Sequence, residues 1–232
     1  MPGGTSACGR EQTRGGVYHS AMSSTQAVLD KALSELVNVH HAHTILLYGS
    51  RANGTHATDS DYDIAAFARC EKGIRIARET PDGFLDAFVY PDTALSAAVP
   101  EHFKLLGGRL LLDRDGRAAE FLRRVEEVHR RGPEALSADE VQMRVVWAHK
   151  MVARASRRDP EGDFRRAWLL TALIEDHFAI NGRWYEGPKK ALAWLQANDA
   201  ALYEAYVAAL RPNASSAQLR VLVDTAYGSM PA

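Results

Sequence analysis

The chain has 232 residues, 46% of them hydrophobic, which is enough for one large domain or two small ones with a substantial core. The formal net charge of −1 excludes a strong overall attraction to nucleic acid or to an anionic membrane, and no segment approaches the roughly 18 apolar residues of a transmembrane helix. Because Cys8 and Cys70 offer neither a disulfide framework nor a zinc-ligand spacing, and the N-terminus lacks the apolar core of a signal peptide, we expect a cytoplasmic protein.

The first half of the chain is expected to contain one helix and five strands. Residues 1–24 are rich in Gly, Ser and Thr without periodicity, which predicts a disordered tail, and apolar residues from Val28 to Val37 then form a helical stripe. The expected strands are "HTILLYG" (43–49), "DIAAFA" (63–68), "GIRIARET" (73–80), "FLDAFVY" (84–90) and, at a sheet edge, "RLLLD" (109–113). Pro81-Asp82-Gly83 is typical of a turn between the third strand and the fourth.

The second half of the chain has helical spacing throughout. A helix from residue 117 is expected to stop at Gly132-Pro133, and a capping box from Ser137 to Glu140 opens another that runs to about Arg158. Further helices are expected over 163–180, 188–198, 200–210 and 216–227. We therefore predict an α+β protein in which a small mixed β-sheet domain flanked by helices, residues 25–115, precedes an all-helical domain, residues 116–232.

The stretch "LLYGSRANGTHATDSDYDIAAF" (46–67) places a Gly-Ser turn and two alternating aspartates between two apolar runs. We expect Gly49 and Ser50 where the first strand turns into a short helix. Glycine lets the backbone approach a ligand closely, and the backbone N–H groups and the Ser50 hydroxyl then suit phosphate oxygens at a helix N-terminus. Arg51 adds a bidentate phosphate donor if it folds back over the turn; alternatively it is only solvated.

Three acidic residues follow in or beside the expected strands. Asp61 and Asp63 are two residues apart at the start of a strand, so their side chains point to the same face. Adjacent carboxylates repel each other, and a divalent cation such as Mg²⁺ removes that cost. Asp86 lies in an apolar strand, where a carboxylate is costly unless it is paired or metal-bound. If this strand lies beside the strand of Asp63, Asp86 joins the cluster.

A purely structural interpretation of these acids is also open. Asp59, Ser60 and Asp61 then belong to a turn, Asp63 caps a helix or ends a strand, and Asp86 pairs with Arg75 or Arg78 across a hairpin. Asp-x-Asp alone is weak support for a site. A Gly-Ser turn after a strand, Asp-x-Asp at this spacing and a third acid together favour the metal and phosphate site.

The segment "GSRANGTHATDSDYD" (49–63) resembles the motif of the DNA polymerase beta-like nucleotidyltransferase superfamily, Gly-Ser followed by Asp-x-Asp. Its form is similar to that of the small-molecule nucleotidyltransferases, including the aminoglycoside and lincosamide resistance enzymes, and the match covers residues 48 to about 89. The resemblance implies a small mixed sheet flanked by helices. It also implies transfer of a nucleoside monophosphate, with ATP as the expected donor, to a hydroxyl with release of pyrophosphate.

The resemblance implies a role for each residue of this chain that matches the motif of the family. Gly49 and Ser50 would hold the β- and γ-phosphates, and Asp61 and Asp63 would bind Mg²⁺, with two ions expected. Asp86 would be the third carboxylate, as a metal ligand or general base. The predicted catalytic and metal-binding residues are therefore Asp61, Asp63 and Asp86, and the predicted nucleotide-binding residues are Gly49, Ser50, Arg51, Ser60 and Lys189.

The helical half offers weaker candidates. Trp184 and Tyr185 lie in the link "INGRWYEGPKK" (180–190), where they either stack on a base or a substrate ring or pack over the helix ends. Lys189 either reaches the triphosphate or is solvated together with Lys190. The same run is similar to a segment in the helical domain of some aminoglycoside-type nucleotidyltransferases. We interpret Trp168 as a core residue.

Two charged segments of the helical half are interpreted without a function. Glu175-Asp176-His177 is expected on the charged face of an amphipathic helix, although it offers a further acid or base. The arginines and lysine between Arg144 and Arg166 are expected on a solvated helix face, although they can also contact phosphates, RNA or an acidic partner. The near-neutral total charge argues against general nucleic-acid binding.

Three hypotheses on function follow. The first is a Mg²⁺-dependent nucleotidyltransferase that modifies a hydroxyl of a small molecule such as an aminoglycoside- or lincosamide-like antibiotic. The second keeps the chemistry but modifies a protein or a tRNA end, as in toxin–antitoxin pairs. The third is a nucleotide-binding module without turnover. The sequence fixes neither the acceptor, the base of the nucleotide, nor the oligomeric state.

Overall fold

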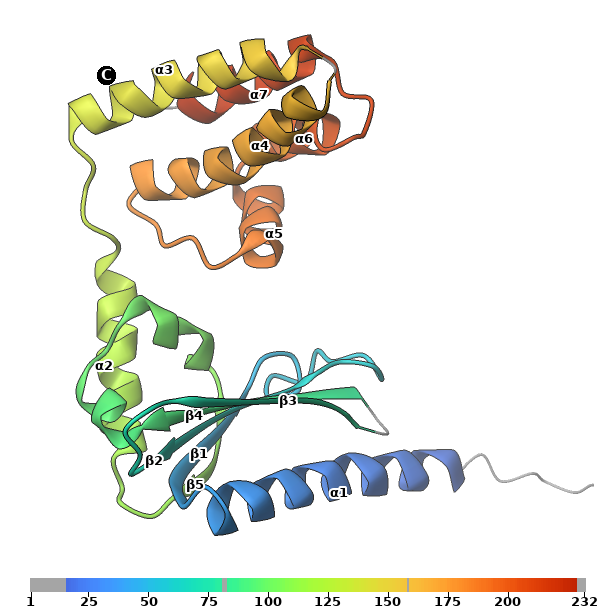
Figure 1. Ribbon diagram of the computed structural model, residues 1–232, viewed down its shortest axis with the longest axis vertical. Coiled ribbons are helices and arrows are strands. Elements are labelled where there is room, and N and C mark those ends of the chain that lie inside the picture. The colour runs from blue at the N-terminus through green and yellow to red at the C-terminus, as the bar shows by residue number, and fades with distance from the viewer. Residues whose placement is uncertain (1–15, 81–82, 158, 229–232) are drawn as a thin grey trace, which may run out of the picture. The chain divides into compact units, whose positions relative to one another are not determined.

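The computed structural model describes residues 16–80, 83–157 and 159–228 (Figure 1). The fold is α+β, with a small mixed sheet in the first half of the chain and helices alone in the second. Its elements are, in chain order, α1 (Gly16–Asn38), β1 (Ala42–Tyr48), β2 (Tyr62–Ala68), β3 (Ile74–Thr80), β4 (Gly83–Pro91), the short 3-10 helices η1 (Asp92–Ser96) and η2 (Pro100–Leu105), β5 (Arg109–Asp113), α2 (Ala118–Arg131), α3 (Ala138–Ala155), α4 (Pro160–Ile180), α5 (Pro188–Asn198), α6 (Ala200–Ala209) and α7 (Ser216–Gly228).

The five strands form one sheet in the order β3-β4-β2-β1-β5. Among the described strands only β2 and β4 pair in parallel; β1 pairs antiparallel with β2 and β5, and β3 pairs antiparallel with β4. All five expected strands are therefore confirmed, with "RLLLD" at a sheet edge as predicted. The strand of Asp86 lies directly beside the strand of Asp63. This is the strand arrangement under which we expected Asp86 to lie close to Asp63.

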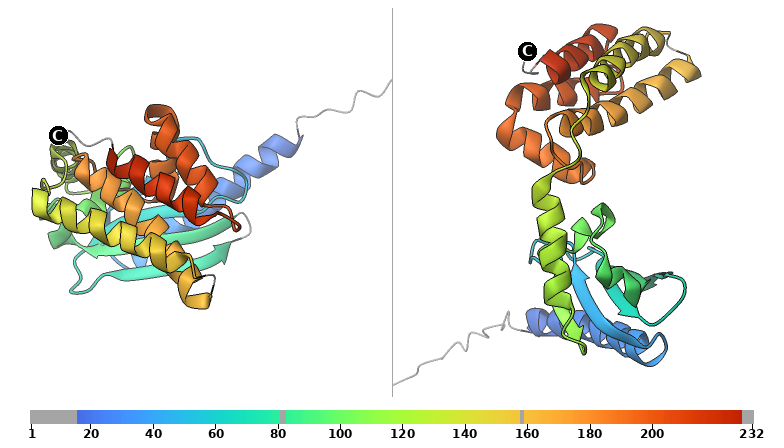
Figure 2. Two further views of the ribbon diagram at one scale, coloured as in Figure 1. Left: turned by 90° about the horizontal axis from the view of Figure 1, so that it is seen from above. Right: turned by 90° about the vertical axis from the view of Figure 1, so that its left-hand side faces the viewer.

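The two faces of the sheet differ because side chains alternate along each strand. One face packs on α1, which lies across the sheet in Figures 1 and 2, through buried residues that include Leu36, Ile64 and Leu85. The opposite face carries Asp63 and Asp86 and is only partly covered. The sequence therefore uses α1 to bury one face of the sheet and leaves the acidic face accessible.

Two local predictions in the first half need correction. Residues 16–24, expected in the tail, continue α1 toward the N-terminus, because no Gly or Pro interrupts the chain from 17 to 24. Residues 50–54 form turns in place of the expected short helix. Here the Thr55 N–H donates to the Ser50 carbonyl over 3.0 Å and Gly54 adopts φ +75°, which ends the turn. The rest of the tail, residues 1–15, and Pro81-Asp82 lie outside the described residues.

The chain divides into two compact units, Met1–Glu127 and Val128–Ala232, so the division falls later than the expected boundary after residue 115. The reason lies in α2. Phe121 of this helix is fully buried and packs edge-to-face on Phe67 of β2, with ring centroids 5.4 Å apart, and on His102 of η2. The first turns of α2 therefore complete the core of the sheet unit.

The second unit is built from α3 to α7, and all of its expected helices are observed. Its core includes Leu173, Leu195 and Leu222 from three different helices. The predicted capping box is present: Glu140 accepts from the Ser137 N–H over 2.8 Å, and the Glu140 N–H donates to the Ser137 hydroxyl over 3.3 Å. None of the described helices combines the length and apolar character that a membrane-spanning helix needs.

Three expectations about side chains in this unit are wrong or incomplete. Trp168 is 47% exposed, so it is no core residue. Asp176 and His177 are buried, whereas the sequence pattern placed them on a charged face; only Glu175 is exposed there. The basic stretch is largely used within the unit, since Arg144 pairs with Asp176 and Arg165 with Glu161.

Candidate active site

The turn after β1 lies against the acid of β2. Gly49 adopts φ +71°, a conformation that favours glycine, and a Cβ atom at this position would lie 2.2 Å from Asp63 Oδ2. Only glycine therefore allows the backbone to approach this carboxylate so closely. Ser50 follows at once and is half-buried. The Gly-Ser turn and Asp63 form one compact site, as the geometry of a strand end requires.

The carboxylates of Asp63 and Asp86 come from neighbouring parallel strands. The two residues are direct partners in the register of β2 and β4, so both side chains leave the same face of the sheet side by side. Asp61 precedes β2 and is exposed, whereas Asp63 and Asp86 are half-buried. Acids that are 23 positions apart in the sequence thus meet across one strand pair.

The electrostatics of Asp63 reflect this arrangement. Burial raises the pKa of its carboxyl group, the charges of Asp61 and Asp86 raise it further, and only Lys104 opposes them. Among the described residues, no donor forms a hydrogen bond with this carboxylate. Asp63 is thus a partly desolvated carboxyl group beside like charges, and a bound cation would stabilise its ionised form.

Asp86 is also held by a cation from β3. Its two carboxylate oxygens accept hydrogen bonds from Arg75 Nε over 2.8 Å and from Arg75 Nη2 over 2.9 Å. This is one of the pairings that the structural interpretation of the sequence proposed. The other does not occur, because Arg78 pairs with Glu35 of α1. Asp86 therefore belongs both to the acidic pair and to a hairpin ion pair.

The donor set suits Mg²⁺, which prefers carboxylate oxygens. Asp63 and Asp86 provide adjacent oxygens, and the raised pKa of Asp63 marks unrelieved negative charge. In the part of the chain that the structure describes, no three Asp, Glu, His or Cys side chains form a ready-made metal cluster. Arg75 occupies both oxygens of Asp86, so Asp86 must release the guanidinium before both of them can reach a metal ion.

Two predicted nucleotide-binding residues hold the loop between β1 and β2. The Arg51 guanidinium donates to the Ser60 carbonyl over 2.9 Å and lies 3.8 Å from the centre of the Tyr62 ring. The Ser60 hydroxyl accepts from the Ala57 N–H over 2.9 Å. These contacts fix the loop that leads into Asp61. In this structure both side chains position the loop, while their predicted contact with phosphate stays a prediction.

The sequence did not indicate Lys104, because the short helix η2 that carries it has no clear periodicity. Lys104 Nζ lies 3.9 Å from the ring centre of Phe88, 5.2 Å from that of Tyr48 and 5.7 Å from that of Tyr90. By the strand register these rings lie on the same face of the sheet as Asp63 and Asp86, and the lysine charge lowers the pKa of Asp63. Lys104 is therefore an ammonium group that favours the ionised form of Asp63.

The remaining predicted residues lie in the second unit. Lys189 is exposed in the first turn of α5, and Lys190 pairs with Glu186, with 2.6 Å between Nζ and Oε2. Trp184 and Tyr185 are half-buried. Tyr185 packs edge-to-face on Phe178, whereas Trp184 lines a pocket.

We expect Gly49→Ala to lower kcat/KM of the activity proposed below by about 100-fold, because the new methyl group must displace the Asp63 carboxylate, and a shift of about 1 Å in a catalytic group has an effect of that size. Gly54→Ala is the matched control. Gly54 has a similar φ of +75°, but nothing lies within 4 Å of the place that a Cβ atom would take there. Both variants should lose stability through backbone strain, and only the first should lose activity. Equal activity of the two variants would show that the contact with Asp63 has no role.

No family model and no curated protein matches this chain. Among solved structures, a nucleotidyltransferase-like protein from Exiguobacterium sibiricum 255-15 matches over 89% of this chain and 73% of its own, with 10% sequence identity and a TM-score of 0.43. Its name describes that protein. What the site of this chain can do follows from the residues of this chain.

Proposed function

We propose that this chain is a Mg²⁺-dependent nucleotidyltransferase, which moves a nucleoside monophosphate, AMP from ATP in the simplest case, to a hydroxyl of a small molecule and releases pyrophosphate. The observation that carries the proposal is the register of β2 and β4. It sets Asp63 directly beside Asp86, while Gly49 holds the Gly-Ser turn against Asp63. A phosphate-binding turn next to paired carboxylates is the arrangement that metal-assisted phosphoryl chemistry needs.

Each residue of the site would have a separate role in the reaction. Asp61, Asp63 and Asp86 would hold the metal, and bound Mg²⁺ would offset the triphosphate charge and keep the attacking and leaving oxygens in line. The Ser50 hydroxyl would donate to a phosphate oxygen. Asp86, when it is not a ligand, would accept the proton of the attacking hydroxyl, and its position on the same face as Asp63 supports this role.

The direct test is pyrophosphate release from ATP and Mg²⁺ with a panel of hydroxyl-bearing acceptors. The panel begins with aminoglycosides and lincosamides, the acceptors that the sequence resemblance suggests. We expect release that depends on both acceptor and Mg²⁺ and stops with EDTA. Incubation with α-labelled ATP and cell lysate separates the alternatives, because label on protein or RNA would favour a macromolecular acceptor. Nucleotide binding without release from any acceptor would favour a module without turnover.

The ion pair between Arg75 and Asp86 leads to a prediction about the Mg²⁺ requirement. Arg75→Ala frees Asp86, so we expect the Mg²⁺ concentration at half-maximal activity to fall by about two- to fivefold, the range expected for losing an exposed ion pair. Arg78→Ala is the matched control, because Arg78 pairs with Glu35 and not with the acids. An unchanged or higher Mg²⁺ requirement in Arg75→Ala would contradict competition between the guanidinium and the metal.

A further inference from the structure

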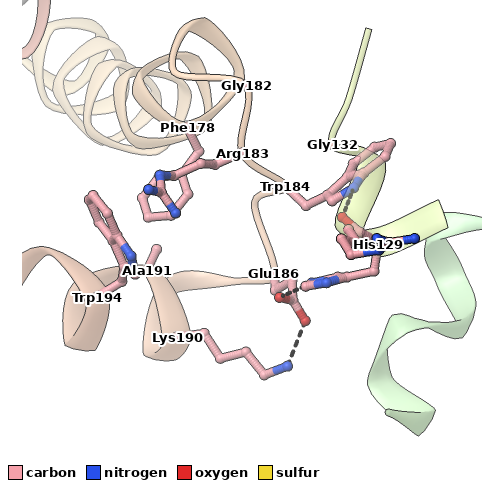
Figure 3. Close-up of a pocket in the computed structure, with 11 residues that line it drawn as sticks. His129, Gly132, Phe178, Gly182, Arg183, Trp184, Glu186, Lys190, Ala191 and Trp194 are labelled. Atoms are coloured by element: carbon pink, nitrogen blue, oxygen red, sulfur yellow. Dashed lines mark hydrogen bonds and ion pairs between the residues drawn. The ribbon is translucent and has the colours of Figure 1, made fainter. Parts of the chain in front are cut away.

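A pocket of about 380 Å³ lies within the second unit, at the loop between α4 and α5 (Figure 3). Aromatic side chains form much of its wall: Phe178 from α4, Trp184 from the loop and Trp194 from α5. The volume lies in the range of small-molecule sites, which are typically apolar clefts with a few placed polar groups. The pocket is therefore large enough for a molecule with one planar ring.

Hydrogen bonds and ring contacts hold these aromatic walls in place. The Trp184 indole N–H donates to the His129 carbonyl over 3.1 Å. Phe178 and Trp194 pack edge-to-face with their ring centres 5.4 Å apart, and the Arg183 guanidinium lies 4.5 Å from the centre of the Trp194 ring. A ligand ring that enters would meet surfaces that are already ordered, which lowers the entropic cost of binding.

The charge of the pocket is one-sided. Glu186 is the acidic residue among its described lining residues, and both of its oxygens are occupied: one lies 2.9 Å from His129 Nε2 and the other 2.6 Å from Lys190 Nζ. Burial alone would raise the pKa of Glu186, but the bonds from Lys190 and His129 lower it overall. The carboxylate is thus ionised and already neutralised by its neighbours.

Two arginines are left without such a partner. Arg130 and Arg183 both line the pocket, and within the described residues neither forms an ion pair with an acid. In Figure 3 Arg183 extends beside Phe178 toward Trp194. Guanidinium groups recognise carboxylates and phosphates through paired hydrogen bonds and also stack on planar rings.

We propose that this pocket binds an anionic ligand with a planar ring, the ring against Trp184 and Trp194 and the carboxylate or phosphate on Arg183 and Arg130. A polycationic molecule such as an aminoglycoside would place its ammonium groups beside these arginines, which is unfavourable. The assignment of this ligand as the acceptor rests on the proposed function; the binding itself does not. Where it is the acceptor, the substrate class is a hydroxylated aromatic acid or phosphate.

Binding is tested by calorimetric titration of the full chain with matched probes: 3-hydroxybenzoate, 3-hydroxybenzyl alcohol and 3-hydroxybenzylamine, with AMP as the nucleotide arm. We expect the benzoate to bind at least about tenfold tighter than the alcohol, as a charge-assisted contact implies, and the amine to bind most weakly. Tight binding of AMP alone would identify the anionic planar ligand as a nucleotide. Equal binding of benzoate, alcohol and amine, or binding of no probe, would overturn the proposal.

Two variants test whether the ligand binds in this pocket. Arg183→Gln should weaken benzoate binding by about fivefold or more and leave the alcohol unchanged. Arg220→Gln is the matched control, since Arg220 is exposed on α7 and does not line the pocket. Equal affinities for benzoate in the two variants would refute the role of Arg183. Selective binding without pyrophosphate release from any acceptor would leave the pocket assignment intact and remove the proposed function, so the two failures are distinguishable.

Discussion

Asp63→Asn should abolish nucleotidyl transfer and, in the absence of metal, raise the melting temperature of the protein. The loss of activity should be about 1,000-fold or more, because a metal-binding carboxylate supports several kcal/mol of charge stabilisation and each 1.36 kcal/mol is a factor of ten in rate. The gain in stability has the same origin. A carboxylate that is positioned to bind a cation lowers the stability of the fold when that cation is absent.

The sign of the stability change follows from the surroundings of Asp63. Burial and the charges of Asp61 and Asp86 raise the pKa of its carboxyl group in the folded state. An acid with a raised folded-state pKa adds no penalty below its unfolded-state pKa. The destabilisation grows as the pH rises from the unfolded-state pKa to the folded-state pKa, and it is fully present above the folded-state pKa. At neutral pH the neutral amide of Asp63→Asn removes that penalty while keeping the shape.

Melting curves in EDTA and in Mg²⁺ measure both parts of this prediction. The wild-type protein should gain stability from Mg²⁺ by mass action, and Asp63→Asn should gain much less. Asp59→Asn is the matched control, since Asp59 lies on the exposed loop before β2 and should leave both activity and melting temperature nearly unchanged. A lower melting temperature of Asp63→Asn in EDTA would mean that its carboxylate is a structural group and no latent metal ligand.

The strands could be predicted because their signals are local. Short apolar runs and, for residues 73–80, the alternation of apolar and polar residues predicted all five strands. The expectation that Asp61 and Asp63 share one face stays a prediction, because Asp61 precedes β2. The parallel pairing that sets Asp86 beside Asp63 is not local. The sequence could state it only as a condition, which the register of β2 and β4 then met.

Other features depend on tertiary contacts that no local sequence pattern predicts. Lys104 acts on Asp63 through a fold that brings η2 to the sheet, and η2 has no periodicity of its own. Trp168 belongs to a strongly apolar segment, yet its side chain stays 47% exposed, with its ring edge-to-face on Trp147 of α3, whereas Leu169 and Leu173 of the same helix are fully buried. A helical stripe predicts which residues can face a core, whereas the packing partners decide which of them do.

Substitution of Asp176 should have a large effect on the stability of the helical unit. The side chain is buried in α4, where one oxygen pairs with Arg144 of α3 and the other accepts from the Tyr227 hydroxyl of α7 over 2.9 Å. One carboxylate thus ties three helices together. Asp176→Ala should destabilise this unit by about 3 kcal/mol, because removing one partner leaves a cation and a hydroxyl poorly compensated.

Scanning calorimetry checks this, with a fall on the order of 10 °C expected in the transition of the helical unit, since about 1 kcal/mol shifts a domain of this size by several degrees. Tyr227→Phe removes one donor only and should cost about 1 kcal/mol. Glu175→Ala is the control, because its exposed side chain is the neighbour that does face solvent. Similar melting of Asp176→Ala and Glu175→Ala would mean that the buried ion pair adds nothing to stability. A clear loss in Asp176→Ala alone would instead establish that this acid is structural, which separates it from the acids that gather at β2 and β4.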